Sequence, residues 1–378
     1  MSAPERGKAL RLGWALAILA VGVRIVFWRH TGRVWEDALI TILHAENAVA
    51  GLGLTHFKPD EPPVHGFTSP LSVLIPLAGE WLRAGFALDA IRVASLAAAF
   101  ATVLMAARIA IAVPQLGLTP ALVLLVCGYL AFEHHQVLWG MAGMETQVAV
   151  CVLLASILFL AQRRHVLLGV SLGLCMLARP DFALWALVVG AWLLLEAART
   201  RDWKPLATVV GISLAIYLPW VAFAWSYYGS PIPNTIVAKS AGYPGYWWLR
   251  EGGIGYWLAG TWYITWVWLM PALGPAFAGN GTGFVKLFDP GVIASAMALA
   301  IVASLAVALA RRQAFVLLLH ASFWIHFAYF VYLVPMMFGW YLSPFLAVGV
   351  ILAAHGLGAL WSLLPRAGPR LAWAASIA

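Results

Sequence analysis

Two adjacent carboxylates, Glu36 and Asp37, follow the first apolar segment of this 378-residue chain. Only 10% of the residues are charged and 63% are hydrophobic, so an acidic pair beside an apolar segment is a candidate for chemistry. A carboxylate can remove a proton from a hydroxyl group. The pair can equally begin an amphipathic helix over Ala38–Ala50, because acidic residues are favoured in a first helical turn. The two roles are compatible.

The composition predicts an all-α polytopic membrane protein. The mean hydropathy is +0.88 and the chain holds 20 tryptophans, which is too apolar for a soluble domain. A strand alternation typical of a barrel is missing, so helices remain as the spanning element. The three cysteines, Cys127, Cys151 and Cys175, lie in apolar segments without the spacing of metal ligands. The net charge of +8 comes from short loops, which favours a topological role over nucleic-acid binding.

Basic residues predict the orientation. Arg6, Lys8 and Arg11 precede the first apolar run and indicate a retained signal anchor with a cytoplasmic N-terminus. Loop 29–91, which carries the acidic pair, is then extracytoplasmic, and so is loop 227–255. The basic clusters at 163–164, 199–204, 311–312 and 366–370 are expected in the cytoplasm. About ten apolar spans result, at 12–28, 92–111, 118–132, 148–160, 166–177, 182–195, 207–224, 292–310, 315–334 and 341–360.

Two apolar segments do not fit that count as spans. Ser69–Phe86 carries Glu80 and Arg83, and we expect it to lie in the outer interface as a juxtamembrane helix. Only one of Tyr256–Leu273 and Val292–Ala310 can cross, and the tryptophan-rich first segment is the better candidate for the interface. We find no internal repeat and no linker, so residues 1–378 are expected to form a single transmembrane domain.

This topology gathers the conspicuous polar residues at the outer face. They are Glu36, Asp37, Glu46, His65, Arg92, His134, His135, Glu145, Arg179, Asp181, Asn234 and Lys239. Carboxylates beside arginine and lysine suit a reaction in which cations hold an anionic, lipid-linked substrate while a carboxylate removes a proton. Each residue also has a structural interpretation: Glu145 can cap a helix, Arg179 and Asp181 can neutralise each other, and Lys239 can be an ordinary loop lysine. His134 and His135 are expected to be interfacial residues rather than metal ligands.

Several short motifs, in order, resemble bacterial GT-C glycosyltransferases. The first-loop segments are Trp35-Glu36-Asp37-Ala38-Leu39-Ile40, Ala45-Glu46-Asn47, Gly51-Leu52-Gly53-Leu54 and Pro63-Val64-His65-Gly66-Phe67-Thr68-Ser69-Pro70-Leu71. The later ones are Gly143-Met144-Glu145-Thr146, Ala178-Arg179-Pro180-Asp181, Pro233-Asn234-Thr235 with Ala238-Lys239, and Gly339-Trp340-Tyr341-Leu342-Ser343-Pro344. The likeness covers residues 35–345 and is closest to the branch of the mycobacterial arabinofuranosyltransferases. Protein O-mannosyltransferases and lipid A aminoarabinose transferases are more distant relatives.

The resemblance implies transfer of a sugar from a polyprenyl-phosphate donor to a glycan, lipid or protein acceptor at the outer face of the bacterial cytoplasmic membrane. The base would come from the acidic pair, and both carboxylates would be essential, with Asp37 ahead of Glu36 because aspartate is usual in the family. We expect Arg92, Arg179 and Lys239 to bind the donor phosphate, and Glu145, His65, Asn234 and Tyr341 to bind the acceptor or sugar. A single displacement would invert the anomeric carbon. Loop 241–255, with Tyr246, Trp247 and Trp248, is a candidate for acceptor recognition.

Two questions stay open at the level of the sequence. A divalent cation, Mg²⁺, Mn²⁺ or Ca²⁺, could be held by the acidic residues, yet Arg and Lys alone could equally balance the phosphate. A transporter or flippase of lipid-linked sugars is the alternative function, because it would also carry polar residues within many helices. Such proteins place their sites near the midplane and show repeats, whereas here the polar residues lie at one edge.

Overall fold

The computed structural model describes residues 1–56, 61–242, 290–332 and 339–363, and every regular element in these ranges is a helix. The elements long and apolar enough to cross a membrane are α1 (Ala3–Thr31), α4 (Ala87–Ala112), α5 (Pro120–Phe132) continued by α6 (His134–Met141), α9 (Ala183–Thr200), α10 (Lys204–Tyr228) and α17 (Gly339–Leu363). Shorter apolar helices are α3 (Pro70–Leu82), α7 (Thr146–Ala161), α8 (His165–Ala178), α15 (Pro290–Ala310) and α16 (Ala314–Tyr332). This confirms an all-α polytopic membrane protein.

The predicted spans overlap these helices within the described residues, and the first loop contains two further helices, α2 and α3. The amphipathic helix predicted over Ala38–Ala50 is α2 (Glu36–Val49). The segment predicted to stay out of the membrane, Ser69–Phe86, contains α3 and ends in a turn. There, Glu80 accepts hydrogen bonds from the backbone N–H groups of Gly85 and Ala87 at the start of α4. Segment Tyr256–Leu273 and loop 241–255 from residue 243 onward lie outside the described residues.

Small residues let the central helices approach closely. A Cβ atom added at Gly13 of α1 would lie 2.7 Å from the Cβ of Ala107 in α4. One added at Gly173 of α8 would lie 2.7 Å from Ile216 in α10, and one at Gly356 of α17 would meet the carbonyl of Ala300 in α15. Because lipid tails are as apolar as leucine, close backbone packing of this kind is a main source of helix association in membranes.

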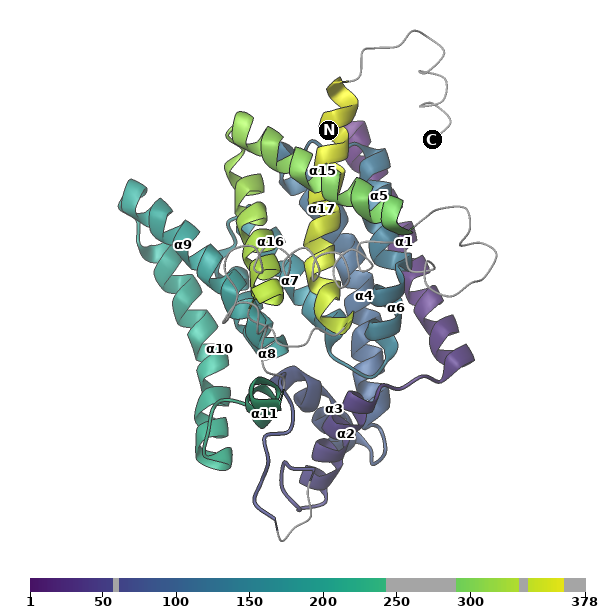
Figure 1. Cartoon of the computed structure of the whole chain (residues 1–378), viewed down its shortest axis with the longest axis vertical. Coiled ribbons are helices and arrows are strands. Elements are labelled where there is room, and N and C mark those ends of the chain that lie inside the picture. The colour runs from purple at the N-terminus through teal and green to yellow at the C-terminus, as the bar shows by residue number, and fades with distance from the viewer. Residues whose placement is uncertain (57–60, 243–289, 333–338, 364–378) are drawn as a thin grey trace.

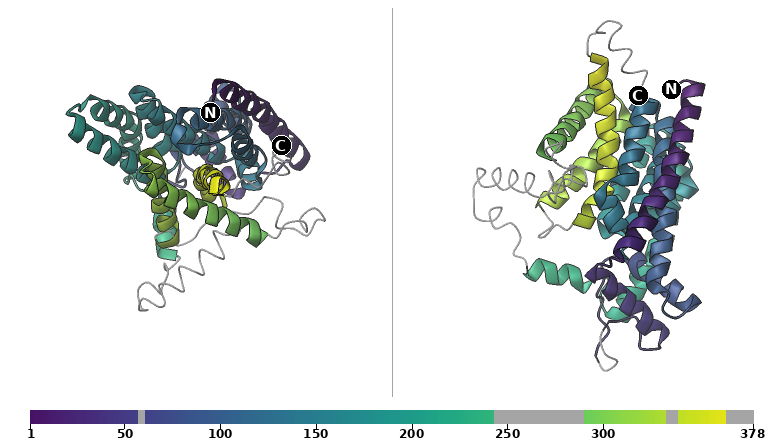
Figure 2. Two further views of the ribbon diagram at one scale, coloured as in Figure 1. Left: turned by 90° about the horizontal axis from the view of Figure 1, so that it is seen from above. Right: turned by 90° about the vertical axis from the view of Figure 1, so that its right-hand side faces the viewer.

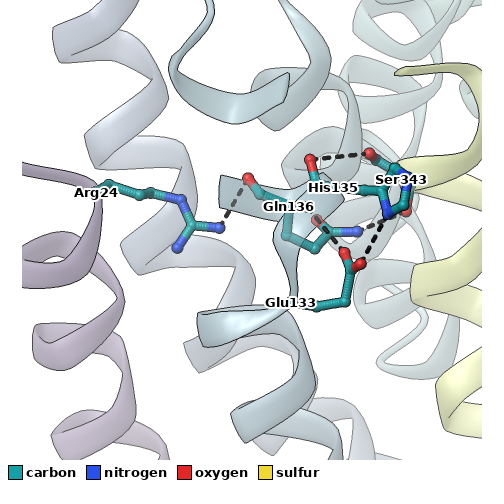
Figure 3. A network of polar contacts seen from close by, with 5 residues as sticks. All are labelled: Arg24, Glu133, His135, Gln136 and Ser343. Carbon is teal, nitrogen blue, oxygen red and sulfur yellow. Dashed lines mark hydrogen bonds and ion pairs between the residues drawn. The ribbon is translucent and has the colours of Figure 1, made fainter. Parts of the chain in front are cut away.

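A buried arginine secures the break between α5 and α6. Arg24 of α1 is 0% exposed, and its guanidinium donates to the carbonyls of Leu130, Ala131 and Gln136 and to the side-chain oxygen of Gln147. The carbonyls at a helix end lack intrahelical partners, and in a membrane no water replaces them. Figure 3 shows Arg24 reaching from α1 to Gln136.

The same network reaches α17. Gln136 donates its side-chain amide to the carbonyl of Ser343 at 2.9 Å, and the Ser343 hydroxyl contacts the carbonyl of His135 (Figure 3). Glu133 caps α6 through the N–H of Gln136 and pairs with the His135 ring at 2.8 Å. The network therefore fixes the start of α17 on α6, which matters because both border the site described below.

The helices give the molecule two distinct ends. The N-terminus and the α9–α10 and α15–α16 connections lie at the upper end of Figure 1. Helices α2, α3 and α11 (Asn234–Gly242) form the lower end, and the right-hand view of Figure 2 shows the same separation. Two of the predicted cytoplasmic turns, at 199–204 and 311–312, thus lie at the end of the bundle opposite α2 and α3 of the first loop.

Candidate active site

A cavity of about 320 Å³ opens where the lower end of the bundle meets the first loop. Its walls come from α2, the loop before α3, the α6–α7 turn, the 3₁₀ turn η2 (Pro180–Phe182), α11, α16 and α17. Its polar lining consists of Asp37, Thr41, Thr68, Ser69, Ser72, Glu145, Arg179, Asp181, Thr235, Tyr329 and Tyr341. Four of the residues predicted from the sequence are in that set: Asp37, Glu145, Arg179 and Tyr341.

Asp37 lies in the first turn of α2, which is held against the α6–α7 turn. The N–H of Trp35 donates to the carbonyl of Ala142 at 2.9 Å, and Gly143 adopts a φ of +88°. A side chain at Gly143 would meet Ala38 at 3.0 Å, so glycine permits the close approach of α2. Asp37 is half-buried at the cavity wall, whereas Glu36 is exposed and does not line the cavity.

Three tryptophans pack together beside Asp37 and stabilise this wall. Trp35 packs edge-on against Trp139 of α6 with ring centroids 4.7 Å apart, and Trp139 packs against Trp340 of α17 at 5.1 Å. Edge-to-face pairs at such distances add stability beyond their buried area. The cluster joins the start of α2 to α6 and to the start of α17, so it ties Asp37 and Tyr341 to one rigid support.

Glu145 lies at the turn between α6 and α7 and is 6% exposed. Burial raises the pKa of its carboxyl to about 7, with further raising contributions from Asp181 and Asp37 and a lowering one from Arg179. A carboxyl group with a pKa near neutrality can donate or accept a hydrogen bond at physiological pH. Glu145 can therefore both donate and accept hydrogen bonds at the cavity wall.

Arg179 is the cation of the described cavity lining. It follows α8 in an extended conformation, and its Nε donates to the two carboxylate oxygens of Asp181 at 3.0 and 3.3 Å. Its guanidinium carbon lies 4.7 Å from the ring centre of Tyr341. Burial alone would lower the pKa of Arg179, but Asp181 and Glu145 raise it above its ordinary value, so the charge is kept. Asp181 binds at Nε, which leaves the two terminal nitrogens for an anionic ligand.

Three more of the predicted site residues, Arg92, His65 and Asn234, lie outside the described cavity lining. Arg92 of α4 donates to the carbonyl of Arg33 at 2.9 Å and lies over Trp28, so it binds the end of α1. His65 is 1% exposed and stacks on Tyr228 at 4.6 Å, and burial lowers the pKa of its ring to about 4. Asn234 is exposed at the start of α11, where its N–H donates to the carbonyl of His65.

Lys239 belongs to α11, and its side chain lies outside the described part of the chain. The neighbouring Thr235 does line the cavity and contacts Thr68 through the two hydroxyls at 3.0 Å. Thr235 and Tyr329 were missed as site residues. Tyr329 lies in an apolar helix whose sequence gives no sign of a polar role, whereas Thr235 adjoins a predicted residue.

A metal site is not formed by the described residues. Among them, no group of three or more histidine, cysteine, aspartate or glutamate side chains is arranged to hold an ion. Asp37, Glu145 and Asp181 share the cavity lining, but Asp181 is paired with Arg179.

Comparison with known proteins gives one structural likeness. No family model and no curated protein matches the chain. Among solved structures, the chain is similar to ArnT from Cupriavidus metallidurans bound to undecaprenyl phosphate, with a TM-score of 0.50 and 16% identity. The match covers 90% of this chain and 59% of that one. The protein is thus a multi-pass membrane protein that shares the fold of the matched part of ArnT.

Proposed function

We propose that this protein is a GT-C-type membrane glycosyltransferase that moves a sugar from a polyprenyl-phosphate donor to an acceptor hydroxyl. The observation that carries the proposal is the convergence of Asp37, Glu145 and Arg179 in one cavity, although they lie far apart in the sequence. The fold likeness to ArnT, which was solved with undecaprenyl phosphate, supports a membrane glycosyltransferase and a polyprenyl-phosphate-linked donor.

Arg179 binds the donor phosphate in this proposal. Its terminal nitrogens are the part of the guanidinium that Asp181 does not occupy, and its plane rests on Tyr341. A phosphate gains negative charge when the glycosidic bond breaks, so a pre-oriented guanidinium stabilises the departing group. Lys239 follows Thr235 by four residues in the sequence. In this proposal Lys239 is the second cation for the phosphate.

Asp37 acts as the general base. It accepts the proton of the acceptor hydroxyl, whose oxygen forms a bond to the anomeric carbon while the bond from that carbon to the phosphate oxygen breaks. The electron pair leaves with the polyprenyl phosphate, and a single displacement inverts the anomeric centre. Glu145 and Tyr341 line the cavity, and in this proposal they bind hydroxyl groups of the sugar or acceptor.

The active face is extracytoplasmic in this proposal. The turns that carry Arg163, Arg201 and Arg312 connect α7 to α8, α9 to α10 and α15 to α16. The latter two connections lie at the end of the bundle opposite α2, α3 and α11 (Figure 1). Since short cytoplasmic loops are rich in Lys and Arg, the cavity belongs to the periplasmic or outer side.

The ordered motifs suggest which donor and which acceptor to test first. The likeness to the arabinofuranosyltransferase branch makes a polyprenyl-phosphate arabinofuranose the first donor to test, followed by mannose and aminoarabinose donors. The acceptor is a glycan, lipid or protein of the cell envelope, so an envelope extract provides all three classes.

The test is a transfer assay with purified protein in nanodiscs. Each polyprenyl-phosphate sugar is offered with the extract, and released polyprenyl phosphate is measured. We expect release from one donor by the natural protein and none by Asp37→Asn. Glu46→Gln is the matched control, because Glu46 is an exposed carboxylate of the same helix, and it should behave like the natural protein. No release from any donor by folded protein would overturn the proposal in favour of a transporter.

A further inference from the structure

A second, smaller cavity lies next to the active-site cavity, between η2, α16 and α17. Its volume is about 10 Å³, close to the lower limit for holding one water molecule. Asp181, Phe330 and Tyr341 line both cavities, so Asp181 has Arg179 and the active site on one side and the small cavity on the other.

His326 of α16 lines this small cavity. The ring is 7% exposed, and its Nδ1 lies 2.9 Å from the carbonyl oxygen of Ser322. A carbonyl can only accept, so Nδ1 carries the proton and Nε2 of the neutral ring is an acceptor. Nε2 is buried and has no hydrogen-bond partner among the described residues. Leaving such an atom unsatisfied costs about 1–3 kcal/mol.

The small cavity is lined by two residues that carry acceptor atoms, His326 with its Nε2 atom and Asp181 with its carboxylate. Neither can donate to the other. A water molecule has two hydrogens and satisfies both acceptors at once, and the remaining lining is apolar apart from Ser322 and Tyr341. Both the volume of the cavity and the chemistry of its lining therefore fit one water molecule.

We propose that one ordered water molecule bridges His326 to Asp181, and that His326 acts as a positioning residue for the active site. The water fixes the carboxylate of Asp181, and Asp181 fixes the guanidinium of Arg179 at its Nε atom. The terminal nitrogens of Arg179 are then held in the orientation that binds the donor phosphate. This consequence for the donor rests on the function proposed above, whereas the water site itself does not.

The water is tested by an experimental structure of the unliganded natural protein at a resolution that shows ordered water. We expect a density peak within hydrogen-bonding distance of both His326 Nε2 and Asp181. A cavity without such a peak, or one filled by a rearranged side chain, would overturn the inference. This result is independent of any transfer activity.

The positioning role is tested with two substitutions of similar size. Glutamine places its amide near the position of Nε2, whereas asparagine reaches only to Nδ1 and can bond Ser322 alone. We expect the dissociation constant for undecaprenyl phosphate in nanodiscs to rise about tenfold, equivalent to about 1.4 kcal/mol, in His326→Asn. It should change less than about twofold in His326→Gln, because glutamine restores an acceptor at the water.

The outcomes separate the two proposals. Equal binding by the natural protein and His326→Asn, at equal thermal stability, would show that His326 does not position Asp181. Equal weakening in both variants would point to a packing role and would also contradict the inference. If the natural protein itself does not bind undecaprenyl phosphate, the proposed function is wrong. The presence or absence of water density at His326 then tests the water site independently.

Discussion

Asp181 accepts both of its hydrogen bonds to Arg179 at the same nitrogen, Nε, at 3.0 and 3.3 Å. The sequence suggested that this pair could simply neutralise itself at a helix break. The geometry separates the two functions of the guanidinium, since Asp181 orients it from one side while the terminal nitrogens are left for a ligand. In the proposed function, a buried arginine held in this way is a pre-organised group for binding the donor phosphate.

Replacing Arg179 by lysine keeps the charge but loses the Nε bond to Asp181 and the contact with Tyr341. We expect kcat/KM to fall by about 10- to 100-fold, because charge-assisted hydrogen bonds contribute about 1.5–3 kcal/mol. Transfer kinetics in nanodiscs measure the change. Arg83→Lys, at an exposed arginine beyond α3, is the control and should be unaffected. Full activity of Arg179→Lys would contradict the assignment of the phosphate site.

The two acidic residues of the first loop should respond differently to neutralisation. Asp37 lines the cavity and Glu36 is exposed outside it. We therefore expect Asp37→Asn to lose turnover and Glu36→Gln to keep most of it. Initial rates with the active donor provide the comparison. The reverse ranking would mean that Glu36, not Asp37, is the base.

Glu145 should make stability depend on pH. Its pKa is raised from 4.5 to about 7, so between these values the folded protein binds more protons than the unfolded one. Stability therefore falls as pH rises from about 4.5 to about 7, by up to about 3 kcal/mol. Glu145→Gln removes this loss of stability. The difference in thermal unfolding temperature between the variant and the natural protein should therefore shift in favour of the variant as pH rises from about 4.5 to about 7. A difference that is constant with pH would show that the carboxyl is not buried in this way.

Arg24 should matter for folding rather than for chemistry. Arg24→Met leaves the carbonyls of the α5–α6 break without their donor inside the membrane, where each unsatisfied group costs several kcal/mol. We expect a marked drop in the thermal unfolding temperature or in the yield of folded protein. Arg29→Met, at an exposed arginine of the same helix, should have little effect. Equal stability of both variants would contradict the role of Arg24.

The sequence predicted the helices well because membrane helices are specified by local hydropathy and by the charges that flank them. It also predicted that Asp37, Glu145 and Arg179 belong to one site, since ionisable residues are rare in so apolar a chain. The acidic residue Asp181 was recognised as a partner of Arg179, but its second neighbour, His326, comes from a distant helix that the sequence does not place.

Arg92 was predicted from the sequence to bind the donor phosphate. It lies near the same end of the bundle as Arg179, yet its guanidinium binds the carbonyls of Gly32 and Arg33. Depth in the membrane follows from the sequence, but the direction of a side chain around its helix depends on the packing of neighbouring helices. The same reason explains why Tyr329 was missed.

The most direct test of the account measures donor binding and turnover together in Asp37→Asn. A general base acts on the acceptor, so its loss should abolish release of polyprenyl phosphate while the dissociation constant for undecaprenyl phosphate changes less than about twofold. Turnover by Asp37→Asn at the rate of the natural protein would contradict the central claim that Asp37 in this cavity is the catalytic base.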